Sequence, residues 1–127
     1  MSRFILDASA LLAFVRREPG GTKVGEVLKY AAMSAVNFAE VLARSLDGGA
    51  DLEWVDSQMR MLPITVIPFG RDDASKAAAL RPQTQHLGLS LADRCCVALG
   101  LTMGLPVLTA DQRWAELDAG VTVEFIR

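Results

Sequence analysis

The chain has few of the residues that build disulfide scaffolds, zinc sites or histidine-based catalysis. Among its 127 residues are two cysteines, Cys95 and Cys96, and one histidine, His86. Adjacent cysteines in a helix point in different directions and cannot readily form a relaxed disulfide, and no C-x-x-C spacing supports a zinc site. Free buried thiols in a reducing cytoplasm are the simplest interpretation.

A basic surface and a long apolar segment are also missing. The net charge is −2 at pH 7, so contact with a nucleic acid would have to use local arginines or metal ions. The apolar run at the start is too short for a signal peptide. The most apolar later stretch, residues 95–108, contains Gly, Thr and Pro and falls short of a membrane span. We therefore expect a cytoplasmic protein with no membrane partner.

The composition that is present favours one aliphatic core. Hydrophobic residues make up 51% of the chain and aromatic residues 6%. The length fits one domain, and no repeat, linker or low-complexity tract divides it. We therefore expect a single domain over residues 1–127.

Short apolar runs alternate with segments of helical spacing. The runs predict strands at residues 3–6, 64–67, 106–109 and 121–125. A further strand at residues 31–34 is expected mainly because something must link the helices on either side. Caps and stops predict helices at residues 8–18, 22–28, 37–47, 51–59, 72–80, 90–103 and 111–117, and a loop at residues 81–89. This order predicts parallel βαβ units. The expected fold is a three-layer α/β/α sandwich around a mostly parallel sheet of about five strands.

Four acids lie near the predicted junctions of strands and helices. Asp7 and Asp111 follow apolar strands, while Glu40 and Asp93 occupy positions typical of the acid in a capping box. Taken singly, each acid is well explained as a helix cap or as a charge that favours the helix dipole.

The joint placement of the acids suggests more than capping. The carboxyl ends of parallel strands open on one edge of a sheet, so all four carboxylates would converge there. Two like charges 4 Å apart repel by about 4 kcal/mol at an effective dielectric constant near 20. A helix dipole offsets about 0.3–1 kcal/mol. Such a cluster needs a cation, or some of its members must take up protons.

Oxygen ligands without Cys or His select a hard cation, Mg²⁺ or Mn²⁺. A phosphate ester is the natural substrate of a carboxylate-held ion of this kind, because the ion screens phosphate charge and activates a bound water. The hydroxyls of Ser9 and Thr109 and the amide of Asn37 could orient the carboxylates or metal-bound waters. Plain capping or turn bonding explains these three residues equally well.

Four segments together resemble the PIN-domain family. They are F-I-L-D-A-S-A-L-L-A at residues 4–13, S-A-V-N-F-A-E-V at 34–41, L-G-L-S-L-A-D-R-C-C-V-A-L-G at 87–100 and P-V-L-T-A-D-Q-R-W at 106–114. In length and in lacking further domains, the chain looks most like the VapC-type toxins of prokaryotic toxin–antitoxin pairs.

The resemblance implies Mg²⁺- or Mn²⁺-dependent cleavage of RNA. It implies that the metal-binding acids are Asp7, Glu40, Asp93 and Asp111, and Thr109 matches the hydroxyl residue that precedes the last acid. It also implies a homodimer and a cognate antitoxin that blocks the cleft, with DNA contacted only through the toxin–antitoxin complex.

The chain departs from the family pattern beyond the last acid. Some relatives carry a further acid there, whereas this chain has Gln112, Arg113 and Trp114, which leaves one or two metal ions open. Arg113 could contact a phosphate or pair with a nearby acid. Two other functions also stay open: a phosphotransfer domain with Asp7 as the phosphate acceptor, and a non-catalytic binding module whose acids only cap helices.

Overall fold

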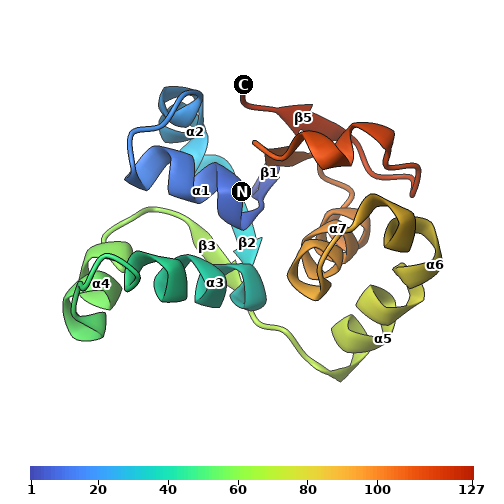
Figure 1. Ribbon diagram of the computed structural model, residues 1–127, viewed down its shortest axis with the longest axis horizontal. Coiled ribbons are helices and arrows are strands. Elements are labelled where there is room, and N and C mark those ends of the chain that lie inside the picture. Colours follow the sequence, from blue (N-terminus) through green and yellow to red (C-terminus); the bar gives the residue numbers. More distant parts are fainter.

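The computed structural model describes all residues 1–127 and contains one five-stranded sheet. Its strands are β1 (Phe4–Leu6), β2 (Ala31–Ser34), β3 (Thr65–Ile67), β4 (Val107–Thr109) and β5 (Val123–Phe125). Every neighbouring pair is parallel, in the order β3-β2-β1-β4-β5 (Figure 1). β1 therefore lies at the centre, and its carboxyl end opens between those of β2 and β4.

Side chains alternate between two apolar faces of this sheet. Leu6, Met33 and Leu108 belong to one core cluster. Ile5 and Val107 belong to the other. The central strands β1, β2 and β4 are buried at almost every position, which explains their mainly apolar residues, whereas the edge strands β3 and β5 are only partly buried.

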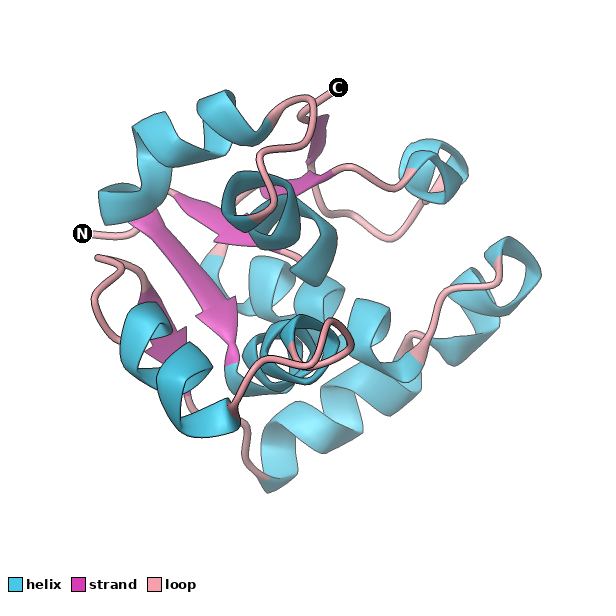
Figure 2. Cartoon of the chain, turned by 60° about the vertical axis from the view of Figure 1, so that its left-hand side comes forward, coloured by secondary structure: helices cyan, strands magenta, loops and turns pink.

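Helices cover both faces. The first cluster includes residues of α1 (Ala8–Val15), α2 (Gly21–Val27), α3 (Ala35–Ser45) and α4 (Leu52–Met59). The second includes residues of α5 (Arg71–Ala79), α7 (Leu91–Met103) and the 3₁₀-helix η3 (Gln112–Glu116). Figure 2 shows the sheet between the helices. The three-layer α/β/α prediction is confirmed.

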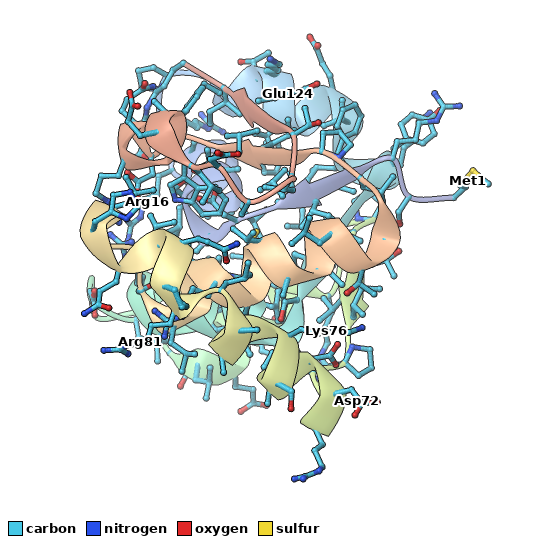
Figure 3. The ribbon with its side chains drawn as sticks, turned by 90° about the vertical axis from the view of Figure 1, so that its right-hand side faces the viewer. Met1, Arg16, Asp72, Lys76, Arg81 and Glu124 are labelled. Carbon is cyan, nitrogen blue, oxygen red and sulfur yellow. The ribbon has the colours of Figure 1, made fainter.

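On the side of the sheet that carries the second core cluster, α5 and α6 (Arg81–Thr84) lie outside α7 (Figure 1). Figure 3 looks onto this side and shows Asp72 and Lys76 on that helix, both exposed. No helix in the structure has the length and apolar character needed to cross a membrane.

The prediction that Asn37 opens the third helix is wrong. Ser34 caps α3, and its Oγ accepts a hydrogen bond from the Val36 N–H at 3.2 Å. Asn37 therefore lies inside the helix with its side chain buried. Glu40 is consequently beyond the first turn and does not form a capping box.

The loop predicted at residues 81–89 is also wrong. It contains α6 (Arg81–Thr84) and the 3₁₀-helix η2 (Gln85–Leu87). Pro82 lies in the first turn of α6, where a missing N–H costs nothing. The buried Thr84 hydroxyl donates to the carbonyl of Leu80, one turn earlier, at 2.8 Å. The polar side chain is therefore satisfied within its own segment.

Other boundaries differ by a few residues. α1 ends at Val15 rather than residue 18, because Arg17 adopts a left-handed conformation with φ 56°. α2 begins at Gly21 rather than Thr22, followed by the 3₁₀-helix η1 (Leu28–Tyr30). The short helix expected at residues 111–117 is the 3₁₀-helix η3.

Candidate active site

Asp7 lies at the carboxyl end of the central strand β1 and caps α1. Its side chain is almost completely buried, with 3% of the residue exposed. Its Oδ1 accepts hydrogen bonds from the Ala10 N–H at 2.8 Å and the Ser9 hydroxyl at 2.7 Å. Its Oδ2 accepts one from the Thr109 hydroxyl at the end of β4, at 2.5 Å. Ser9 thus contacts the acid two residues before it, whereas the Thr109 side chain donates to Asp7 and not to Asp111, its neighbour in the sequence.

Burial raises the pKa of Asp7 to about 6. The hydrogen bonds from Thr109, Ser9 and Ala10 oppose this rise, while the charge of Asp93 adds to it. Asp7 is therefore ionised at neutral pH at a considerable cost in free energy. A nearby cation would reduce that cost.

The hydroxyls of Ser9 and Thr109 also join the ends of β1 and β4. The Ala110 N–H donates to Ser9 Oγ at 2.9 Å, and the Asp111 N–H donates to Thr109 Oγ1 at 3.0 Å. Each hydroxyl donates a hydrogen bond to the Asp7 carboxylate and accepts one from a backbone N–H of residues 110–111. This network fixes the backbone of Asp111 relative to Asp7.

Asp93 lies in the first turn of α7 and forms the predicted capping box with Ser90. The Ser90 N–H donates to Asp93 Oδ2 at 2.8 Å, and the Asp93 N–H donates to Ser90 Oγ at 3.1 Å. No protein donor reaches the other oxygen, Asp93 Oδ1. Capping therefore uses one oxygen of this carboxylate and leaves the other for a ligand.

Asp111 follows β4 and binds the guanidinium of Arg113. Arg113 Nε lies 3.1 and 3.0 Å from its two oxygens, and Nη2 lies 2.6 Å from Oδ2. Hydrogen bonds from Arg113 lower the pKa of Asp111 below its usual value. Of the two roles considered for Arg113 from the sequence, pairing with a local acid is confirmed.

Arg113 also reaches a second acid, which the sequence did not indicate. Its Nη2 lies 3.6 Å from Asp93 Oδ2, and its Nη1 donates to the Gly88 carbonyl at 2.8 Å. The contact between Arg113 and Asp111 could be expected because the two residues are two positions apart. The contacts of Arg113 with Asp93 and with the Gly88 carbonyl depend on the path of the chain before α7.

Glu40 stands apart from the other three acids. Its side chain is 34% exposed and pairs with Arg44 one turn later, at 3.7 Å. No hydrogen bond or ion pair links it to Asp7, Asp93 or Asp111. Of the four predicted acids, three are therefore linked through shared partners, and Glu40 is not. Thr109 links Asp7 to Asp111, and Arg113 links Asp111 to Asp93.

Asn37 joins the helix of Glu40 to the helix of Asp93. Its Nδ2 donates to the carbonyl of Ala92, the residue before Asp93, at 2.9 Å. Asn37 is 1% exposed, and its Oδ1 is buried without a hydrogen-bond partner. It thus fixes how α3 packs on α7 and contacts no carboxylate.

The donor set of this edge fits a hard divalent cation in its chemistry. Asp7 Oδ2 accepts one hydrogen bond and has a second lone pair, and Asp93 Oδ1 has no protein donor. No three Asp, Glu, His or Cys side chains lie close enough together to hold an ion as they stand. Arg113, which bridges Asp93 and Asp111, supplies the positive charge at this edge.

Comparison with known proteins identifies the family. The PIN domain family model matches residues 4–120. The chain belongs to the PIN-domain family. None of the curated protein sequences matches it significantly.

Solved structures share the fold of this PIN domain over its whole length. A chain of DNA-bound VapBC from Salmonella typhimurium superposes with a TM-score of 0.75 and 16% identity, covering 100% of both chains. For VapBC2 from Rickettsia felis, bound to a promoter DNA fragment, the TM-score is 0.71 at 15% identity, covering 96% and 97%. For VapBC-5 from Mycobacterium tuberculosis it is 0.63 at 24% identity, covering 100% and 99%. At these identities the similarity shows a common fold.

Proposed function

We propose that this PIN-domain protein is a metal-dependent endoribonuclease and the toxin of a type II toxin–antitoxin pair. The observation that supports this most is the linkage of Asp7, Asp93 and Asp111 at one sheet edge, where ligands of parallel α/β folds bind. The three acids come from the ends of β1 and β4 and the start of α7. Family membership and the fold shared with VapBC chains support the same assignment.

In this proposal Asp7, Glu40, Asp93 and Asp111 hold Mg²⁺ or Mn²⁺. When bound, the ion would neutralise phosphate charge and lower the pKa of a nearby water. Ser9 and Thr109 fix the orientation of Asp7, and their hydrogen bonds favour its ionised form. Asn37 holds α3, the helix that carries Glu40, against the start of α7.

Asp7 is poorly suited to accept a phosphoryl group. Both of its oxygens already accept hydrogen bonds, and the residue is buried. A phospho-aspartate at this position would have to break that network.

Cleavage of RNA with and without a divalent cation tests the nuclease proposal. We expect the purified chain to cut RNA in Mn²⁺ or Mg²⁺ and to lose activity in excess EDTA, because the carboxylates alone cannot neutralise the phosphate. Fragments separated by gel electrophoresis give the rate. Cleavage that persists unchanged in EDTA would show that the acids act in another way.

A large groove among the helices that pack on the first core cluster supports the antitoxin part of the proposal. It has a volume of about 1100 Å³ and lies between α1, α2, α3 and α4. Its apolar lining includes Phe14, Val15, Trp54 and Met59, and 60% of Trp54 is exposed. None of the four proposed metal ligands lines it.

The charges at the groove suit an amphipathic partner segment. The basic side chains that line it are Arg16, Arg17 and Arg44, against two acids, Glu18 and Glu26. A segment with an apolar face and acidic residues would fill the groove and pair with the excess positive charge. Arg44 also pairs with Glu40, so an occupant here would lie beside a proposed metal ligand. We assign the groove to the antitoxin.

Trp54→Ala is expected to weaken antitoxin binding about tenfold to a hundredfold, because a large exposed aromatic in a groove is a typical binding hot spot. A toxin–antitoxin pair predicts that a neighbouring reading frame encodes a small protein, and the measurement is the dissociation constant for that protein. Leu52→Ala is the matched control, since Leu52 is exposed on the same helix but does not line the groove. Equal affinity of the wild type and Trp54→Ala would place the antitoxin elsewhere. RNA cleavage by either variant alone should stay at the wild-type rate.

The proposal also includes a single nuclease domain over residues 1–127 and a cytoplasmic location, both inferred from the length and composition of the chain. The resemblance adds a homodimer and contact with DNA only through the antitoxin.

A further inference from the structure

We propose that Arg113 is an internal counter-ion that competes with the divalent cation for Asp93 and Asp111. Metal loading would then be an exchange, in which the guanidinium leaves the carboxylates as the cation arrives. This inference rests on the proposed function, because it concerns the same acids.

The contacts of Arg113 differ from those of every other ion pair in the structure. Arg44, Arg60 and Arg127 each contact one carboxylate, whereas Arg113 contacts two. The backbone N–H of Arg113 and its side-chain Nε and Nη2 all donate to the Asp111 carboxylate. Nη2 also lies near the Asp93 carboxylate. A guanidinium placed between two acids supplies the charge that a cation would otherwise supply.

The bridge is also anchored away from the acids. Arg113 Nη1 donates to the carbonyl of Gly88, which adopts a left-handed conformation with φ 70°. This contact comes from the turn just before Ser90 and Asp93, so it holds the guanidinium at the start of α7. The planar fork of arginine suits such simultaneous contacts better than an ammonium does.

The side chain is nevertheless free to leave. It is 54% exposed, and it begins in a short 3₁₀-helix at the surface. Departure would cost solvent-accessible hydrogen bonds and would not open the core. After exchange, Asp111 and Asp93 Oδ2 would lose the guanidinium, while Asp93 would keep its capping bond from the Ser90 N–H.

Mn²⁺ binding measured by calorimetry on the metal-free protein tests the exchange without any assay of cleavage. Arg113→Gln is expected to tighten the Mn²⁺ dissociation constant about fivefold, the upper range for an exposed ion pair. Arg113→Lys keeps the charge but loses the fork, so it should fall between the wild type and Arg113→Gln. Arg60→Gln removes the same charge from an exposed pair with Asp56 and should leave the constant unchanged.

The outcomes separate this inference from the proposed function. Equal or weaker Mn²⁺ binding by Arg113→Gln would overturn the inference, as would equal tightening by Arg60→Gln, which would reflect net charge alone. No saturable Mn²⁺ binding by any of the four proteins would contradict the metal site itself. Thermal unfolding shows whether Arg113→Gln is folded, and if it is not, Arg113→Lys must still bind Mn²⁺ more tightly than the wild type.

Discussion

Asp7→Asn is expected to slow Mn²⁺-dependent RNA cleavage at least about a hundredfold, because charge stabilisation by a bound metal ion is worth several kcal/mol. Asp7 follows the central strand β1, and hydrogen bonds from Ser9 and from Thr109 at the end of β4 orient its carboxylate. Asparagine has nearly the same shape but no charge, so it would be a much weaker ligand for a hard cation.

The variant should fold, since asparagine is as good a helix cap as aspartate. The measurement is the initial rate on the RNA that the wild type cuts fastest, at saturating Mn²⁺. Asp56→Asn is the control, because Asp56 pairs with Arg60 on the exposed part of α4. A rate for Asp7→Asn equal to that of the control would remove Asp7 from the catalytic site.

The same variant is expected to make the metal-free protein more stable. Raising the pKa of Asp7 from 3.8 to about 6 corresponds to about 3 kcal/mol of lost stability at neutral pH, at 1.36 kcal/mol per pKa unit. Asparagine removes the buried charge and keeps the cap. Urea unfolding in EDTA at pH 8 should therefore give a free energy of unfolding up to about 3 kcal/mol higher for Asp7→Asn than for the wild type.

The pH dependence of this difference has a definite sign. Because the folded-state pKa of Asp7 is raised, the folded protein holds this proton more tightly than the unfolded chain does. The wild type therefore gains stability relative to Asp7→Asn as the pH falls from about 6 to 3.8, and the advantage of the variant shrinks over that window. Asp111, whose pKa is lowered, titrates in the opposite sense but is present in both proteins. If the difference in free energy of unfolding between the two proteins stays constant from pH 8 to pH 4, ionisation of Asp7 does not destabilise the folded protein.

Most of the fold could be predicted from local patterns. Short apolar runs predicted most of the strands, whereas β2 was inferred mainly because something had to link the helices on either side. The Ser90 cap and Gly104 stop define α7 as expected. Convergence of strand ends at one edge placed Thr109 in the same region as Asp7, but which carboxylate its hydroxyl would contact was left open.

The failures come from contacts made across the chain. Asn37 is a residue type that often caps helices. Here packing of α3 on α7 buries it, and Ser34 caps the helix instead. The bridge from Arg113 to Asp93 joins residues 20 positions apart through the turn at Gly88. Spacing along one element cannot reveal either contact, since both depend on how two elements meet.

The central claim is that carboxylates scattered from residue 7 to residue 111 meet at a common divalent cation. Anomalous diffraction from crystals soaked in Mn²⁺ would locate such an ion directly. The account predicts a peak within ligand distance of Asp7 and Asp93, with the Arg113 guanidinium displaced from Asp93. Saturating Mn²⁺ with no peak at this edge, and with Arg113 still bound to both acids, would contradict it.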